Sequence, residues 1–166
     1  MWPSYSNGQK ITKCNSGTQI QVTRDENDLF EQMDSQWISY TGDNLSFWSH
    51  EMNSHGYCYI QKYKIDNYND YFRKALQIFN NNNLDTLMKE AFGEQSETME
   101  FSVTELKQGL KRASGGLNFD LDCIGHNGQQ HLREVRFYFD LDFETVRNDS
   151  LTSNCKSSQP VYVHFE

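Results

Sequence analysis

The chain has 166 residues, enough to bury the core of one domain, and we expect a single domain over residues 1–166. Its formal net charge is -8, from 15 Lys and Arg against 23 Asp and Glu, so its overall field does not attract a polyanion. This balance argues against a basic, sequence-recognising RNA-binding domain. The lack of any run of about 18 apolar residues argues against a membrane-spanning helix.

The first half of the chain predicts loops and helices. Residues 1–22 are rich in Ser, Asn, Gly and Thr and predict a loop. Residues 24–40 predict an amphipathic helix, because apolar side chains recur there at three- and four-residue steps, and residues 41–44 predict a turn after it. A short helix follows, and beyond it we expect helices over residues 68–80 and 84–92.

The short helix after the turn carries most of the acid–base chemistry of the sequence. Residues 47–55 contain neither Pro nor Gly, and Gly56 follows as a stop signal, so we expect the helix to end near His55. At about 100° per residue, Glu51 and His55 share a face one turn apart, and His50 borders that face. The segment therefore brings two imidazoles and a carboxylate close together.

Three interpretations of these side chains are open at this point. A zinc-protease helix needs His-Glu-x-x-His, and the spacing from His50 to His55 is one residue too long for it. In the second interpretation, the histidines are merely solvated surface groups. In every interpretation, Trp48 and Met52, four residues apart, can anchor the helix to a core. The third interpretation, which we favour, is acid–base chemistry without a metal. Histidine titrates near neutrality, and the carboxylate of Glu51 can hold its tautomer or stabilise a developing charge.

The last third of the chain changes its period from helix to strand. Ser102 and Glu105 form a capping-box pattern that opens a helix ending near Ala113. Alternating apolar residues then predict strands over residues 117–123 and 132–143, a turn over 125–128 between them, and a final strand over 161–165. His126 and His131 flank the hairpin tip, where we expect solvated turn residues. Helices followed by strands predict an α+β fold.

One segment matches a known family motif. The matching residues are Phe47, Trp48, His50, Glu51, His55, Gly56 and Cys58. The segment resembles the second conserved motif of the ribonuclease T2 family, Phe-Trp-x-His-Glu-Trp/Tyr-x-Lys-His-Gly-x-Cys, a family that includes plant S-RNases and S-like RNases. The chain departs from it at Met52, where an aromatic residue is usual, and at Ser54, where the family has Lys. The resemblance implies an α+β fold with an antiparallel β-sheet flanked by several α-helices.

The resemblance also implies an activity: a metal-independent endoribonuclease that cleaves single-stranded RNA through a 2′,3′-cyclic phosphate, with no cofactor. In that reaction a base takes the proton of the ribose 2′-hydroxyl, an acid protonates the leaving 5′-oxygen, and cations or donors stabilise the phosphorane. By resemblance, His55 is the base, His50 helps to bind the phosphate, and Glu51 supports the transition state. The residues implied in substrate binding are Trp2, Phe47 and Trp48. Neither DNA nor a membrane is an expected partner, and we expect a monomer.

The general acid of the family is a His in a first motif, His-Gly-Leu-Trp-Pro. Trp2 and Pro3 match its end, and Met1 stands where its Leu would be, so the His would lie before Met1 and we expect an N-terminally truncated domain. Losing that acid costs about two to four decades in rate, and Ser54 in place of Lys removes a donor worth about 3 kcal/mol. The alternative hypothesis is a truncated or degenerate homologue, weakly active or inactive, with an RNA-binding or storage role.

The cysteines and two glycosylation sequons bear on the cellular compartment in which the protein is located. No C-x-x-C spacing is present, which argues against a zinc ribbon. The family pattern pairs the four cysteines as Cys14 with Cys58 and Cys123 with Cys155. Four free thiols in a cytosolic protein are the alternative. Sequons begin at Asn44 and Asn148, and they favour a glycosylated protein of the secretory pathway, located outside the cell or in the vacuole.

Overall fold

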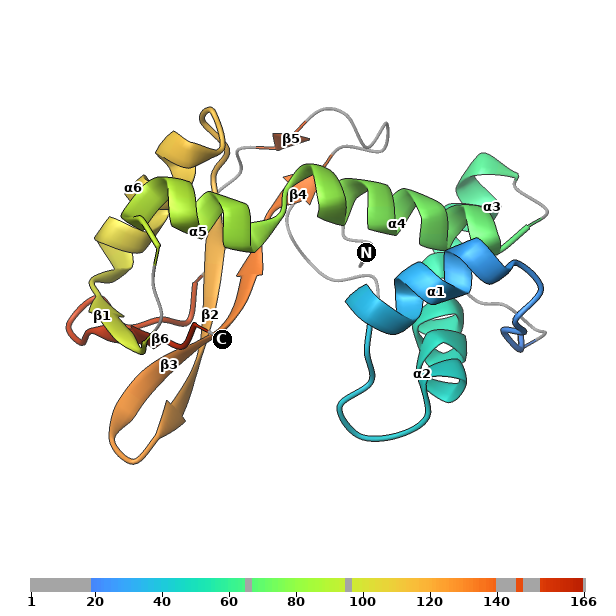
Figure 1. Cartoon of the computed structure of the whole chain (residues 1–166), viewed down its shortest axis with the longest axis horizontal. Coiled ribbons are helices and arrows are strands. Elements are labelled where there is room, and N and C mark those ends of the chain that lie inside the picture. The colour runs from blue at the N-terminus through green and yellow to red at the C-terminus, as the bar shows by residue number, and fades with distance from the viewer. Residues whose placement is uncertain (1–18, 65–66, 95–96, 140–145, 148–152, 166) are drawn as a thin grey trace. The chain divides into compact units, whose positions relative to one another are not determined.

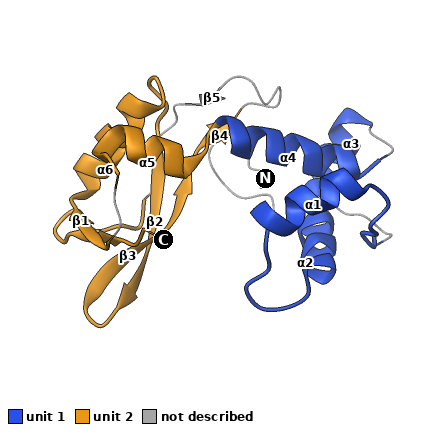
Figure 2. Cartoon of the chain, in the orientation of Figure 1, with its two compact units in different colours: residues 1–81 blue, residues 82–166 orange. Residues whose placement is uncertain are grey.

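The computed structural model of the chain describes residues 19–64, 67–94, 97–139, 146–147 and 153–165 (Figure 1). They belong to two compact units, unit 1 over residues 1–81 and unit 2 over residues 82–166, and each is described by itself (Figure 2). Helices and a mixed sheet make up these units, so the predicted α+β class is confirmed. The single domain expected over residues 1–166 stays a prediction.

Unit 1 is built from helices. They are α1 (Asn27–Gln36), α2 (Asn44–Glu51), the π-helix η1 (Met52–Gly56), α3 (Tyr57–Tyr63) and α4 (Asn69–Asn81). Met33 of α1 and Phe72 of α4 lie in the same core cluster as Trp48 and Met52, and all four side chains are 0 % exposed. The predicted anchoring of the histidine-bearing helix by Trp48 and Met52 is therefore confirmed.

Unit 2 combines helices with a sheet. Its elements are α5 (Leu84–Phe92), β1 (Met99–Phe101), α6 (Val103–Ala113), β2 (Asp120–His126), β3 (Gln129–Arg136), β4 (Tyr138–Phe139), β5 (Val146–Arg147) and β6 (Val161–Val163). Within the described residues, the larger sheet has the strand order β1-β6-β3-β2, and β4 pairs with β5. The β1–β6 and β2–β3 pairs are antiparallel, whereas β3 and β6 are parallel, so the sheet is mixed rather than purely antiparallel. The parallel pair arises because β6 inserts between β1 and β3.

Helix α6 fixes the core of unit 2. Its Leu106 belongs to the core cluster that also holds Leu121 of β2 and Val161 of β6. The predicted capping box is confirmed: the hydroxyl of Ser102 accepts the N–H of Glu105 at 3.1 Å, and the Glu105 carboxylate accepts the N–H of Ser102 at 2.7 Å. The local sequence therefore sets where α6 begins, and its apolar face is covered by the sheet.

Strands β2 and β3 form the predicted hairpin around a two-residue turn. Asn127 has φ 48° and Gly128 has φ 81°, and two successive positive φ angles match the twist of the flanking strands. Because the turn is so short, both strands extend further towards it than the sequence predicts, to His126 and Gln129. The strand expected over residues 132–143 is interrupted between β3 and β4.

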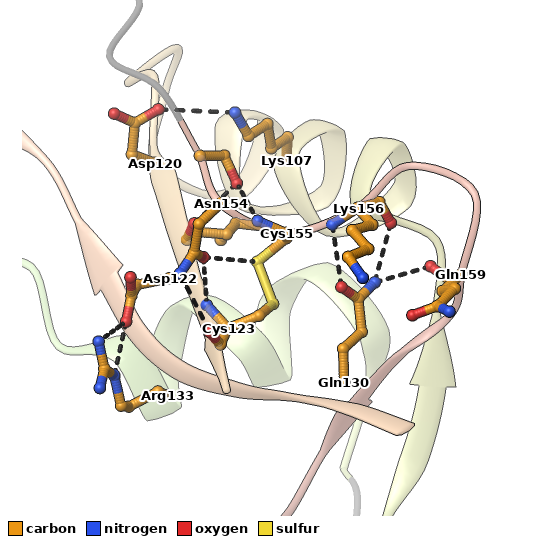
Figure 3. Close-up of a disulfide and its surroundings, with 12 residues drawn as sticks. Lys107, Asp120, Asp122, Cys123, Gln130, Arg133, Asn154, Cys155, Lys156 and Gln159 are labelled. Atoms are coloured by element: carbon orange, nitrogen blue, oxygen red, sulfur yellow. Dashed lines mark hydrogen bonds and ion pairs between the residues drawn. A yellow bond between two sulfur atoms is a disulfide. The ribbon is translucent and has the colours of Figure 1, made fainter. Parts of the chain in front are cut away.

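A disulfide and polar side chains tie the segment before β6 to this hairpin (Figure 3). Cys155 is bonded to Cys123 of β2, which confirms one predicted pairing. The Asn154 amide accepts the N–H of Cys123 at 2.7 Å and donates to its carbonyl at 3.1 Å. Gln130 of β3 donates to the carbonyl of Lys156 at 2.9 Å and accepts its N–H at 2.9 Å. The covalent bond is thus backed by two amide side chains that pair with backbone.

Candidate active site

Helices α2, η1 and α3 follow one another without a loop, so the predicted short helix is part of a longer helical run (Figure 1). The run begins at Asn44, before the predicted start, because the Asp43 carboxylate caps it by accepting the N–H of Ser46 at 2.8 Å. That hydrogen bond lowers the pKa of Asp43. The predicted end near His55 is also wrong, since Gly56 lies inside the run.

The turn that carries His55 is a π-turn. The N–H of Tyr57 reaches the carbonyl of Met52, five residues earlier, so the chain rotates less per residue than the roughly 100° of an α-helix. The smaller rotation keeps Glu51 on the face of His55 and draws His50 towards that face. The three predicted catalytic residues therefore lie within six consecutive residues of the run, with Glu51 and His55 on one face.

The three side chains differ in how far they reach into solvent. His50 is exposed, and His55 is half-buried with its Nδ1 atom shielded from solvent. Glu51 is only 9 % exposed, so its carboxylate lies at the inner edge of the group. Ser54, which stands where the motif has Lys, is half-buried and supplies a hydroxyl but no charge. Such a gradient suits one group that meets an anion in solvent and two that act from a more protected position.

Trp48, predicted to bind substrate, lies in the core instead. It is 0 % exposed, its indole N–H donates to the carbonyl of Trp37 at 2.8 Å, and its ring centroid lies 5.6 Å from that of Phe30. An indole in this position supports α2 and presents no face to a nucleotide base. The anchoring role that the sequence also predicts for Trp48 is the one that the structure bears out.

The remaining predicted site residues are placed only in part. Phe47 is half-buried at the edge of the same core cluster, and its contact with substrate stays a prediction. Trp2 lies outside the described residues. Cys58 is disulfide-bonded, while its predicted partner, Cys14, also lies outside them. Within the described ranges, no group of three or more His, Cys, Asp and Glu side chains is placed to hold a metal ion. None of the described helices is both long and apolar enough to cross a membrane.

Helix α4 supports the site through Tyr71, for which the sequence analysis predicted no role in the site. Tyr71 is 1 % exposed, and burial raises the pKa of its phenol, with a further increase from the negative charge of Glu51. The phenol therefore stays protonated beside that carboxylate. A Cβ on Gly56 would lie 2.9 Å from the Tyr71 ring and 2.5 Å from Cε of Met52. Gly56 is thus needed for the close approach of η1 to α4, a contact that no local pattern signals.

Comparisons with known proteins show which family this chain matches. The profile of the Ribonuclease T2 family matches residues 1–159. The chain is similar to a ribonuclease T2-like protein of Emericella nidulans, with 26 % identity over 183 residues that cover 98 % of this chain and 43 % of that protein. It is also similar to ribonuclease DdI of Dictyostelium discoideum, with 28 % identity over 137 residues that cover 76 % of this chain and 60 % of that protein. The chain thus covers less than two thirds of the length of each of these relatives.

A solved structure shows the same fold. Ribonuclease MC1 from the seeds of bitter gourd is 26 % identical, with a TM-score of 0.77 over 99 % of this chain and 81 % of that one. A mutant of ribonuclease MC1 has been solved in complex with 5′-GMP. The α+β arrangement described above therefore recurs in a known ribonuclease.

Proposed function

Because the chain belongs to the ribonuclease T2 family, we propose that it is an endoribonuclease that cleaves single-stranded RNA at the site formed by α2 and η1. The observation that supports the proposal is that His50 and Glu51, at the end of α2, and His55, in η1, lie within six consecutive residues of one helical run. These residues are the ones that match the family motif. The proposed reaction uses neither a metal nor another cofactor and leaves a 2′,3′-cyclic phosphate.

Each side chain has a proposed step that suits its burial. His55 takes the proton of the ribose 2′-hydroxyl as that oxygen attacks the adjacent phosphorus. His55 is half-buried, which suits a base that acts from a partly protected position. Exposed His50, once protonated, binds a phosphate oxygen, because a cation in solvent is accessible to a polyanion. The buried carboxylate of Glu51 stabilises the cation that forms on the imidazole as His55 takes the proton.

The leaving 5′-oxygen also needs a proton, and none of these three residues is assigned to supply it. Ser54 adds no positive charge at the phosphorane. The lack of that charge favours the second candidate function, a weakly active or inactive homologue that binds RNA or serves as a storage protein.

The remaining parts of the proposal concern partners and compartment. We infer single-stranded RNA as the substrate, with no role for DNA or a membrane, and a monomeric protein. The disulfide between Cys123 and Cys155 supports a secreted or vacuolar location, because disulfides persist in oxidising compartments. N-glycosylation at the two sequons is part of the same proposal, although the amide of Asn44 donates to Asp34 at 2.9 Å in the folded chain.

Cleavage of single-stranded RNA tests the proposal directly. The assay uses the full chain at about pH 5, with EDTA present to remove metal ions. We expect products ending in a 2′,3′-cyclic phosphate, and a loss of at least about a hundredfold in His55→Ala. The matched control is His126→Ala, because His126 is an exposed imidazole of unit 2 that lies outside the proposed site. Its activity should equal that of the unchanged chain.

Two outcomes separate the candidate functions. Cyclic-phosphate products that disappear in His55→Ala but not in His126→Ala support the endoribonuclease. Folded protein that cleaves no faster than His55→Ala rejects catalysis by this chain. Titration with 5′-GMP and with a short single-stranded RNA then decides whether the site binds RNA or neither ligand.

A further inference from the structure

The side chain of Asn53, the second residue of η1, makes three hydrogen bonds to backbone groups. Its Oδ1 accepts the N–H of Ile20 at 2.9 Å, and its Nδ2 donates to the carbonyl of Ile20 at 2.7 Å. The same Nδ2 donates to the carbonyl of Ser49 at 2.6 Å. The Asn53 amide thus binds both backbone groups of Ile20, as the backbone of a neighbouring strand would. It also donates to a carbonyl of its own helical run.

A second side chain continues this pairing. Ser49 lies four residues before Asn53, and its hydroxyl accepts the N–H of Val22 at 3.0 Å. Ile20 and Val22 belong to the extended segment 19–23, which we call the strap. Val22 and Ser49 are 5 % and 8 % exposed, so these hydrogen bonds are protected from water. Two polar residues on one face of the run therefore bind alternate backbone groups of the strap.

Asn53 also sits where the helix changes its hydrogen-bond pattern. In a regular α-helix, the carbonyl of Ser49 would accept the backbone N–H of Asn53. Here the N–H of Met52 is directed at the carbonyls of both Ser49 and Trp48, as the run passes from α2 into η1. The side-chain amide of Asn53 supplies the Ser49 carbonyl with a further donor. The Asn53 side chain thus adds a hydrogen bond to the run at the point where α2 passes into η1.

We propose that Asn53 is a positioning residue for His55: by tying the strap to the Ser49 carbonyl, it fixes the π-turn and with it the direction of the His55 imidazole. The proposal rests on the proposed function, in which His55 is the base. In the family motif as quoted above, both Ser49 and Asn53 occupy positions marked x, so the motif assigns them no role. The proposal gives these positions one: they set the backbone that the motif histidines depend on.

The test compares two asparagines of unit 1 that each bridge a backbone group and a second partner. Asn53→Leu removes the hydrogen bonds to the strap and to Ser49. Asn44→Leu is the matched control, because the Asn44 amide accepts the N–H of Ser39 at 2.9 Å and donates to Asp34 at 2.9 Å, before the π-turn begins. Both variants lose buried or half-buried hydrogen bonds, so both should be less stable than the unchanged chain.

The readout is the imidazole NMR signals of the full chain, followed through a pH titration. We expect Asn53→Leu to move the His55 signals and to shift their titration midpoint by about half a pH unit or more. Asn44→Leu should leave them unchanged. The histidines of unit 2, His126, His131 and His164, serve as internal controls, and their titration should be the same in every variant.

Kinetics give a second readout where the unchanged chain cleaves RNA. A displaced base should lower kcat by about 10- to 100-fold while KM changes by less than about twofold, because the substrate contacts remain. If the unchanged chain does not cleave RNA, the proposed function fails, but the NMR comparison still decides the role of Asn53.

His55 signals that are the same in folded Asn53→Leu and in the unchanged chain overturn the proposal and leave Asn53 as a purely structural contact. If Asn53→Leu does not fold, Asn53→Ala replaces it, since it removes the same three hydrogen bonds and adds no charge near His55. The same two outcomes then apply to the His55 signals of that variant.

Discussion

Unit 1 and unit 2 each bring histidines together, and the two arrangements have opposite consequences. In unit 2, Nδ1 of His131 lies 2.8 Å from Nε2 of His164, and Nδ1 of His164 lies 2.7 Å from the hydroxyl of Thr98. The two rings are 8° from parallel with centroids 5.0 Å apart, which at that nitrogen distance places them edge to edge in one plane. The fourth nitrogen, Nε2 of His131, is shielded from solvent and has no hydrogen-bond partner within the described residues.

Three of the four ring nitrogens of His131 and His164 therefore make hydrogen bonds within unit 2. His131, expected from the sequence to be a solvated turn residue, is instead a link between β3 and the segment after β6. In unit 1, His50 and His55 lie on one helical run beside a carboxylate, and His50 is open to solvent. The comparison teaches that an acid–base site needs a nitrogen left for the substrate and a carboxylate close by, and that neighbouring histidines alone do not provide one.

The two units also hold their histidines by different means. Unit 2 uses a covalent bond, the Cys123–Cys155 disulfide, reinforced by Asn154. The described part of unit 1 holds the site through hydrogen bonds from Asn53 and through the close contact of Gly56 with α4. A change in either support should affect its own unit first, and the following experiments test that separation.

The largest effect is expected from removing the disulfide of unit 2. Replacing both cysteines, Cys123→Ser and Cys155→Ser, should lower the free energy of unfolding by about 3–4 kcal/mol, since the bond closes a loop between residues 32 apart. Urea denaturation measures the loss. Hydrogen exchange should rise in β2 and β6 while η1 keeps its protection. An equal rise in η1 would show that the two units do not hold their histidines independently.

The next effect concerns the support of the site in unit 1. Gly56→Ala should lower the free energy of unfolding by about 1–3 kcal/mol through overpacking, because the added methyl group would meet the Tyr71 ring at 2.9 Å. That cost exceeds the gain of about 1 kcal/mol that Ala brings to a helix interior. The control is Gly42→Ala, where nothing lies within 4 Å of the added Cβ. Thermal unfolding of Gly56→Ala at or above the temperature of the unchanged chain would contradict the close contact.

The histidine pair of unit 2 should matter for stability and not for cleavage. His164→Ala removes the hydrogen bonds to His131 and Thr98, each worth about 1 kcal/mol or less at this exposed position. We expect a lower melting temperature and RNA cleavage within about twofold of the unchanged chain. A loss of cleavage as large as in His55→Ala would show that the histidine pair of unit 2 takes part in the reaction. It would contradict the conclusion that this pair has only a structural role.

The sequence was sufficient for features that depend on neighbours along the chain. The start of α6 follows from the capping box of Ser102 and Glu105, and the helical conformation of the segment that carries His50 and Glu51 follows from its local composition. The hairpin follows from alternation and a turn pattern. In each case the interacting groups lie within a few residues of one another, so local rules apply.

Features that depend on distant contacts were not predictable in this way. Gly56 resembles a helix stop in sequence, yet it lies inside the run because Tyr71 packs against it. The hydrogen bonds that we propose fix the π-turn join Asn53 to Ile20, 33 residues away. The burial of Trp48 against α1 is likewise a tertiary contact, which is why the motif alone suggested a substrate-binding indole.

The smallest effects are expected from two carboxylates, one in each unit, whose pKa values are shifted in opposite directions. In unit 1, hydrogen bonds from Arg24 and then Asn44 hold the pKa of Asp34 at about 2, below its ordinary value of 3.8. In unit 2, burial raises the pKa of Asp120, and the nearby Lys107 only partly offsets it. The ionised form is therefore favoured by folding at Asp34 and disfavoured at Asp120.

The pH dependence of the two variants follows from these signs. Asp34 stabilises the fold above about pH 4, and that contribution is lost as the pH falls towards about 2. Asp34→Asn should therefore be less stable than the unchanged chain at neutral pH, by at most about 1 kcal/mol after solvent screening. This difference in stability should shrink in acid. Asp120→Asn should be as stable as the unchanged chain or more stable at neutral pH, because it removes a buried charge, and its advantage should shrink as the pH falls through the raised pKa of Asp120. Thermal unfolding of both variants between about pH 7 and pH 3 measures the two trends. Parallel trends would mean that the carboxylates of the two units are not held in the opposite ways that their surroundings indicate.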